Sequence, residues 1–167
     1  MVLTNLNSQN KTTKDPSIKY RAYAALMSSV DVDNFPSAVK AVVSENPLKA
    51  DAKWNHIDFL AGSINPTTAP GESPSSQKLT IAASVEGISE EVLDWFYSVN
   101  GERIIFVWER CSDGKKFIAG SPCSGGLLVS GTIGELDNKF RGLKLTLTGA
   151  DCPEPFWVYT GELPVEE

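Results

Sequence analysis

The stretch LKLTLTG, residues 143–149, has the most regular pattern in the chain. Apolar and polar residues alternate along it in the order Leu143, Lys144, Leu145, Thr146, Leu147 and Thr148. Because successive side chains of a β-strand point to opposite faces of a sheet, this alternation predicts a strand with one buried face and one solvated face. The fold is therefore expected to be built from strands.

The sequence around this strand has the same character, and residues 78–161 form one β-rich block. Strands are predicted in KLTIAASVEG, ERIIFVWE, KKFIAGS, GGLLVSGTIGEL and PFWVYTGEL, with glycine-containing turns between them. Earlier in the chain, HIDFLAGSI (56–64) is a further predicted strand, and residues 18–30 form a strand or, because of their alanines, a helix. In segment 38–44 β-branching favours a strand, although the spacing of the valines permits a helical turn.

One helix is predicted at about residues 89–100. Ser89 is a suitable N-cap, two glutamates follow where the helix dipole favours negative charge, and an Asn-Gly pair supplies the stop. We expect Trp95, Phe96 and Tyr97 to enter the core at one open end of the sheet layers. A ligand-stacking cluster is the alternative for these three rings.

About seven to nine strands and one helix predict a mainly β protein, either a β-sandwich or a partly closed barrel with a short flanking helix. The 167 residues suit one domain, which would bury roughly 70% of its unfolded surface. We expect this domain at residues 18–167. Residues 1–17 are polar and predict a flexible arm, and residues 65–77, with three prolines, predict a long loop. Both segments are interpreted as assembly elements that become ordered against a neighbouring subunit.

Acidic residues outnumber basic ones by 21 to 15, which gives a net charge of −6 and a pI of about 4.9. This charge disfavours sequence-specific binding of nucleic acid, whereas a passage lined with carboxylates would let a duplex slide through without sticking. No apolar run approaches the roughly 20 residues that span a bilayer, and the first 17 residues show no secretion or lipid signal. We therefore expect a soluble protein, made in a cytoplasm, without membrane contact.

The chain has three cysteines, Cys111, Cys123 and Cys152, and one histidine, His56. They are widely spaced and include no C-x-x-C pair, so we expect buried, reduced cysteines and no metal site. A disulfide between Cys123 and Cys152 is the alternative under oxidising conditions.

No catalytic set is predicted. Nucleophilic hydrolysis usually requires a histidine base beside the nucleophile, and only His56 is available. The stretch GSPCSGG, residues 120–126, lacks the G-x-S-x-G spacing and suits a bulge or tight turn better than a nucleophile loop. Phosphate, dinucleotide and calcium motifs do not occur in the sequence. We therefore expect a protein that is no enzyme and needs no cofactor.

The aromatic ending PFWVYTGEL invites a carbohydrate-binding interpretation, because Phe156, Trp157 and Tyr159 could present flat faces to sugars. In a strand, however, Phe156 points away from the face that carries Trp157 and Tyr159. One of the two sets must face the core, which leaves at most two rings for a ligand. A ligand-binding β-sandwich module of the carbohydrate type is therefore the alternative function.

The order of a strand-rich start, a Pro/Ser-rich loop, one helix and a closing FRGLKLTLTG resembles the tail tube proteins of long-tailed bacteriophages. The stretches GERIIFVWERCSDGKKFIAGSPCSGGLLVSG and PEPFWVYTGEL are similar to tail proteins of phages and prophages from Bacteroides-type bacteria. The similarity covers about half of the chain and lies in the general sequence pattern, not in a diagnostic motif.

The resemblance implies a structural virion protein of the tail. In that family six copies join edge strands into a hexameric ring, and rings stack into a tube through which DNA passes without specific binding. A flexible arm and a long loop connect the rings, and residues 1–17 and 65–77 are the matching segments here. Other tail proteins would be further partners. The acidic residues that could line the lumen are Glu86, Asp113, Glu135 and Asp137.

Overall fold

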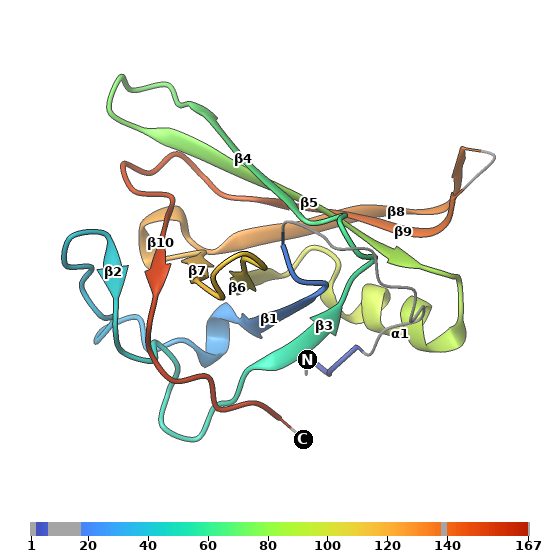
Figure 1. The fold of residues 1–167 in the computed structure, drawn as a ribbon, viewed down its shortest axis with the longest axis horizontal. Helices are drawn as coiled ribbons and strands as arrows, with labels where there is room; N and C mark the ends of the chain where they lie inside the picture. The colour runs from blue at the N-terminus through green and yellow to red at the C-terminus, as the bar shows by residue number, and fades with distance from the viewer. Residues whose placement is uncertain (1–2, 7–17, 138–139, 167) are drawn as a thin grey trace.

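The protein is described by a computed structural model that covers residues 3–6, 18–137 and 140–166. Within them lie ten strands and one α-helix, and Figure 1 shows how these elements are arranged. The strands are β1 (Arg21–Leu26), β2 (Val42–Val43), β3 (Asn55–Asp58), β4 (Asn65–Pro70), β5 (Gln77–Glu86), β6 (Arg103–Glu109), β7 (Lys116–Ala119), β8 (Leu127–Asp137), β9 (Phe140–Thr148) and β10 (Phe156–Tyr159). The prediction of a mainly β fold with one short helix is confirmed. The sheet is open and is not closed into a barrel.

Two layers of strands meet at β6. One layer has the order β3-β1-β6-β7-β10-β2, and the other, which we call the long sheet, has the order β8-β9-β5-β4. The layers are joined where Arg103 and Ile104 of β6 pair with Leu128 and Leu127 of β8. Figure 1 shows the long sheet lying across the shorter strands. This is a sandwich-like arrangement with a continuous connection on one side.

The alternation in residues 143–149 has the predicted consequence. Leu143, Leu145 and Leu147 are almost completely buried, while Lys144 between them is exposed. They face the other layer together with apolar side chains from β1, β5, β6 and β8. Burial of apolar surface contributes about 25 cal/mol per Å², so this core stabilises the packing of the two layers.

Helix α1 (Glu90–Val99) closes one end of this core, close to its predicted bounds. The hydroxyl of Ser89 accepts a hydrogen bond from the backbone N–H of Val92 at 3.2 Å, which caps the first turn. Trp95 and Phe96 are buried in the core. Tyr97 points outward and is 66% exposed, so the prediction of core packing holds for two of the three aromatic residues.

A second core lies on the opposite face of the shorter layer, where residues 27–54 cover it. Strand β6 is therefore buried from both sides: every residue from Ile104 to Trp108 is buried. This explains the continuous apolar run in ERIIFVWE, which lacks the alternation of β9. The helical alternative for residues 18–30 is wrong, since this segment contains strand β1 followed by a short 3₁₀ turn.

The prediction of a flexible arm at residues 1–17 is wrong for residues 3–6, and residues 7–17 lie outside the described residues. Leu6 is completely buried and Leu3 nearly so. The backbone N–H of Leu6 donates to the carbonyl of His56 at 2.9 Å, and Asp58 N–H donates to the carbonyl of Leu6 at 2.7 Å. Two leucines in a polar segment show no periodicity, so only their position beside β3 in the structure shows that they belong to the core.

The prediction of a long loop at residues 65–77 is wrong for residues 65–70. These residues form β4, which pairs antiparallel with β5 over its whole length. A strand tolerates proline where the missing N–H would point away from the paired neighbour. Pro66 and Pro70 are four residues apart, so their backbone nitrogens both lie on the edge of β4 that faces away from β5. Gln77, the last residue of the predicted loop, begins β5, and residues 71–76 form the turn of this hairpin, closed by a Gly71 N–H to Ser76 carbonyl bond of 2.9 Å.

Candidate functional site

The outer face of the long sheet is broad and carries few charges. Pairing across the sheet places small and hydroxylated side chains in transverse rows, for example Thr67, Thr80, Thr148 and Leu128 in one row. Among the side chains that the structure describes, the charged ones on this face are those of Lys78, Glu86 and Lys144. The other members are Asn65, Ala69, Ala82, Ser84, Ser130, Thr132 and Thr146. Such a face can form hydrogen bonds but attracts neither phosphates nor cations strongly.

The β8 edge of the long sheet is open beyond the junction with β6. Val129 turns its backbone away from β9: its N–H donates to the carbonyl of Glu102 at 2.9 Å, and its carbonyl accepts from Gly101 N–H at 2.8 Å. Alternate residues of a strand point the same way, so Gly131 and Ile133 present their N–H and C=O groups at this edge. Among the described strands, none pairs with this edge past Leu128.

The β4 edge on the other side of the long sheet is poor in donors. The carbonyl of Ser84 in β5 points toward the β4 side, where it accepts a hydrogen bond from the N–H of Leu60. Backbone groups two residues apart along β5 point to the same side. The backbone groups of residues 65, 67 and 69 of β4 therefore bond to β5, and the backbone groups of Pro66, Thr68 and Pro70 lie on the free edge. The outer edge offers three carbonyls but only one N–H, that of Thr68. The N-P-T-T-A-P spacing could have signalled such an edge strand in the sequence.

The other layer ends in edges that are covered or short. Leu6 pairs with Ile57 on the outer side of β3. At the opposite end, β2 has two residues, and Val42 also bonds to Val39 across a tight turn. Within the described part of the chain, only the long sheet offers extended backbone edges for pairing with another molecule.

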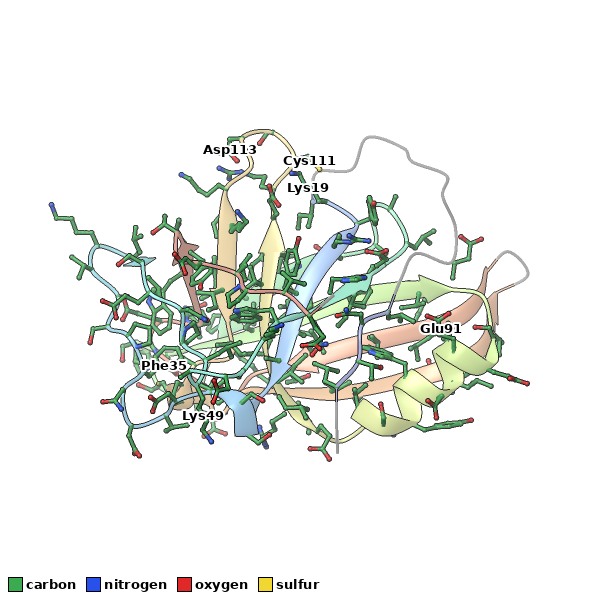
Figure 2. The ribbon with its side chains drawn as sticks, turned by 90° about the horizontal axis from the view of Figure 1, so that it is seen from below. Lys19, Phe35, Lys49, Glu91, Cys111 and Asp113 are labelled. Carbon is green, nitrogen blue, oxygen red and sulfur yellow. The ribbon has the colours of Figure 1, made fainter. Side chains whose placement is uncertain are left out.

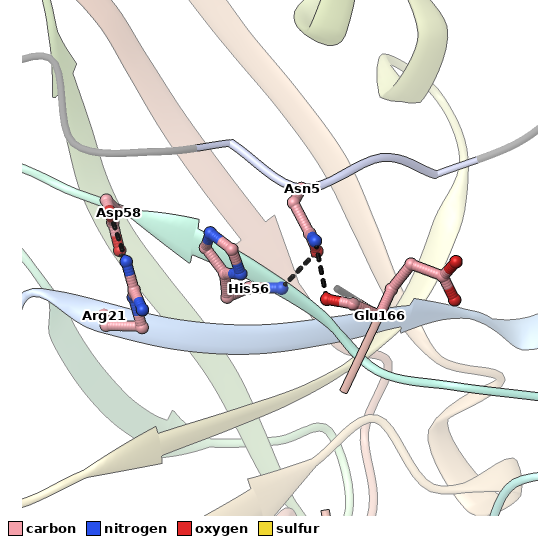
Figure 3. Close-up of polar contacts among 5 residues, drawn as sticks. All are labelled: Asn5, Arg21, His56, Asp58 and Glu166. Carbon is pink, nitrogen blue, oxygen red and sulfur yellow. Dashed lines mark hydrogen bonds and ion pairs between the residues drawn. The ribbon is translucent and has the colours of Figure 1, made fainter. Parts of the chain in front are cut away.

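His56 lies in a polar seam with Asn5 and Glu166, which Figure 3 shows. Its backbone N–H donates to the side-chain oxygen of Asn5 at 2.8 Å, and the Asn5 amide donates to the carbonyl of Glu166 at 2.8 Å. Burial lowers the pKa of His56, and the positive charge of Arg21 acts in the same direction. The seam thus ties residues 3–6 and the C-terminal segment to β3.

Arg21 forms a two-pronged ion pair with the buried carboxylate of Asp58, with N–O distances of 2.6 and 2.9 Å (Figure 3). The hydrogen bond to Asp58 raises the pKa of Arg21. Each residue belongs to a different strand, since Arg21 opens β1 and Asp58 ends β3. The pair therefore fixes the register of these strands. Sequence analysis did not single it out because its partners lie 37 residues apart.

Two of the three cysteines are brought together. The Sγ atoms of Cys123 and Cys152 lie 2.6 Å apart, whereas Cys111 lies in the turn between β6 and β7 (Figure 2). Among the described residues, no three His, Cys, Asp or Glu side chains are grouped so that they could hold a metal ion. The GSPCSGG stretch forms a 3₁₀ turn, Pro122–Ser124, in which Ser124 Oγ donates to the carbonyl of Ser121 at 3.0 Å.

The C-terminal aromatics leave one exposed ring. Tyr159 is buried, and its hydroxyl donates to the carbonyl of Glu162 at 2.5 Å. Trp157 is half-buried against Phe35 in the second core. Phe156 is 36% exposed and packs beside Trp108 and Phe117. A single ring is a weak platform for a sugar.

Of the four acidic residues considered for a lumen, the two with described side chains, Glu86 and Asp113, lie in different elements. Glu86 lies on the outer face of the long sheet. Asp113 lies in the β6–β7 turn, well away from α1 in Figure 2, where its hydrogen bonds with Arg110 hold the pKa of its carboxyl far below the usual value. The side chains of Glu135 and Asp137 lie outside the described part of the structure.

A pocket of about 580 Å³ opens where the two chain ends meet. Residues from four segments line it, including Leu3, Asn5, Ser28, Lys53 and Glu166. Lys53 and Glu166 are the ionisable side chains among its lining, and Ser28 and Ser29 bring hydroxyl groups to the same wall.

Comparisons of the chain with protein families, curated proteins and solved structures found no match. Within the described residues, no helix is long and apolar enough to cross a membrane. The open edges of the long sheet are therefore the candidate site on geometric grounds.

Proposed function

We propose that this protein is a self-assembling structural component of a virion tail. Copies join through the edges of the long sheet into rings, and the rings stack into a tube for DNA passage. The observation that carries the proposal is the open β8 edge at Gly131 and Ile133, on the same sheet as the outer edge of β4. The resemblance of the sequence to tail tube proteins supports the same function.

The strand directions fit a continuous ring. In the long sheet β8, β9, β5 and β4 are each antiparallel to the next, so β8 and β4 run in opposite directions. When β4 of one copy lies beside β8 of the next, the new pair is antiparallel as well. This contact uses two different edges of the same molecule, and such a heterologous contact generates a ring if its rotation closes.

The hydrogen-bonding groups of the two edges set the strength of this contact. The β8 edge provides N–H and C=O groups at Gly131 and Ile133, while β4 provides three carbonyls and the N–H of Thr68. The two prolines of β4 leave gaps in a joining ladder. Proteins place proline on edge strands to prevent uncontrolled pairing. The contact should therefore be weak between two free copies and gain strength from ring closure and stacking.

The outer face of the long sheet would line the ring. Its hydroxyl groups and scattered charges give DNA little to bind, and the net charge of −6 opposes association with phosphates. An acid-lined wall is not required for passage without specific binding. Other tail proteins would meet the ends of the tube.

Two proline substitutions test the edges directly. Ile133→Pro removes an outward N–H from β8, and Thr68→Pro removes the remaining outward N–H of β4; neither N–H takes part in the ladders within the long sheet. The matched controls, Ile133→Ala and Thr68→Ala, shorten the same side chains and keep the N–H. Light scattering and negative-stain imaging of the purified proteins report the assembly state.

We expect rings or tubes from the wild-type protein and from both alanine variants, and folded monomers from both proline variants. Circular dichroism establishes that each variant retains its β content. Tubes from the proline variants at wild-type yield would refute edge pairing. A wild-type protein that remains a folded monomer at the highest attainable concentration would refute self-assembly.

A further inference from the structure

The thiol pair Cys123–Cys152 lies at the base of the β8–β9 hairpin. Cys123 belongs to the 3₁₀ turn that leads into β8, and Cys152 follows β9 by four residues. The backbone N–H of Cys152 donates to the carbonyl of Gln77 at 3.0 Å, and Gln77 N–H donates back at 2.9 Å, which docks this segment on the start of β5. The two cysteines are 29 residues apart in sequence, and the whole hairpin lies between them.

We propose that Cys123 and Cys152 are a redox-sensitive site whose oxidation to a disulfide staples the base of the β8–β9 hairpin. The Sγ separation of 2.6 Å leaves about 0.6 Å to close to the length of a disulfide bond, so oxidation requires little movement of the backbone. The proposal does not depend on ring formation. It concerns a bond within one molecule.

The exposure of the two thiols assigns their roles. Cys123 is exposed and can meet a small disulfide such as oxidised glutathione, whereas Cys152 is 2% exposed, and its Sγ lies against Cys123 Sγ and, at 3.5 Å, the carbonyl of Glu154. The Cys123 thiolate attacks one sulfur of glutathione disulfide, and one glutathione leaves as a thiolate. Cys152, after losing its proton to solvent, then attacks the Cys123 sulfur and expels the second glutathione. Two protein thiols are oxidised, and one glutathione disulfide is reduced to two glutathione molecules.

The protonation of Cys123 makes the first step slow at neutral pH. A hydrogen bond with Cys152, followed by burial, raises the pKa of Cys123 to about 11. Only the thiolate attacks, so the rate should rise about tenfold for each pH unit between 7 and 10. The site therefore resists brief exposure to oxidant and responds to sustained oxidising conditions.

The experiment incubates the folded full-length protein with glutathione disulfide or with a thiol reductant, followed by alkylation under denaturing conditions and mass spectrometry. We expect three alkylated cysteines after reduction and one, Cys111, after oxidation. Peptide mapping without reductant should recover a Cys123–Cys152 cross-link. The oxidised protein should melt on the order of 10 °C higher, because the bond closes a loop of about 30 residues.

Three variants separate this bond from other thiol reactions. Cys111→Ser should keep the cross-link and the melting shift. Cys152→Ala should stop at a glutathione adduct on Cys123 without the melting shift, and Cys123→Ser should show neither adduct nor shift at the pair. Three alkylated cysteines after prolonged incubation of the wild-type protein at pH 9, or a persistent glutathione adduct on Cys123, would overturn the proposal.

Discussion

Leu6→Ala is the substitution that most directly tests whether residues 3–6 belong to the folded core. Leu6 is completely buried, and both its N–H and its carbonyl bond to β3. The substitution keeps these backbone bonds and removes only the side chain. Any loss of stability therefore measures the apolar packing of the Leu6 side chain, in a segment that was predicted to be a flexible polar arm.

The expected loss is about 3 kcal/mol in the free energy of unfolding. Replacing a fully buried leucine by alanine costs about 2 to 5 kcal/mol, since the transfer energy of the lost methyl groups adds to that of the cavity. We choose the lower half of this range because the exposed Thr4 and half-buried Asn5 place this part of the chain at the surface, where it can partly collapse into the space. With a urea m-value of about 2 kcal/mol per molar, the midpoint should fall by about 1.5 M.

Equilibrium unfolding in urea, followed by tryptophan fluorescence, measures this change. Trp95 is a suitable reporter because its indole N–H donates to the carbonyl of Thr4 at 3.2 Å, next to the substituted position. The m-value should stay constant, which would show that both proteins unfold over the same surface.

Thr4→Ala is the matched control. The Thr4 side chain is exposed, and the bond to Trp95 uses the backbone carbonyl, so its stability should stay within about 0.5 kcal/mol of the wild-type value. If Leu6→Ala were equally neutral, residues 3–6 would not be docked in solution, and the reasoning that places them in the core would fail.

Three further measurements address single features of the fold. Ala41→Gly should raise the melting temperature by about 1 to 4 °C, because Ala41 has a φ of +63° in a tight turn that glycine adopts without strain. Gly131→Ala should cost about 1 to 3 kcal/mol in urea unfolding, because the new Cβ would lie 2.5 Å from the carbonyl of Lys144. Because the pKa of His56 is lowered in the folded protein, the unfolded chain binds a proton at His56 more readily, and stability should fall as pH drops below 6.5. Unfolding midpoints at pH 7.5 and 5.5 test this. His56→Gln should weaken the pH dependence of stability.

Local patterns in the sequence predicted the helix and most of the strands, although the strand expected at residues 56–64 ends at Asp58. The alternation in residues 143–149, the cap at Ser89 and the stripe through Trp95 and Phe96 all have their expected structural counterparts. These signals depend on residues within one strand or one helical turn of each other.

The same local reasoning failed where a neighbouring strand decides the conformation. Residues 65–70 contain two prolines, which argue against a strand until it is known that β5 pairs with only one side of the segment. Leu3 and Leu6 stand among polar residues, and only the folded core, which includes residues of β3 and α1, provides the apolar surface on which they pack. In both cases the prediction evaluated the segment as if it were isolated in water.

The mainly β fold with one capped helix follows from local sequence patterns, because side-chain periodicity and capping act over a few residues. Which edges remain open, which residues of segment 3–6 are buried and which thiols meet depends on the packing of the whole chain. These properties join groups that are distant in the chain, such as Cys123 with Cys152, 29 residues apart, and Asn5 with Glu166, 161 residues apart. Such pairs depend on how the two layers stack at β6, which no local pattern encodes.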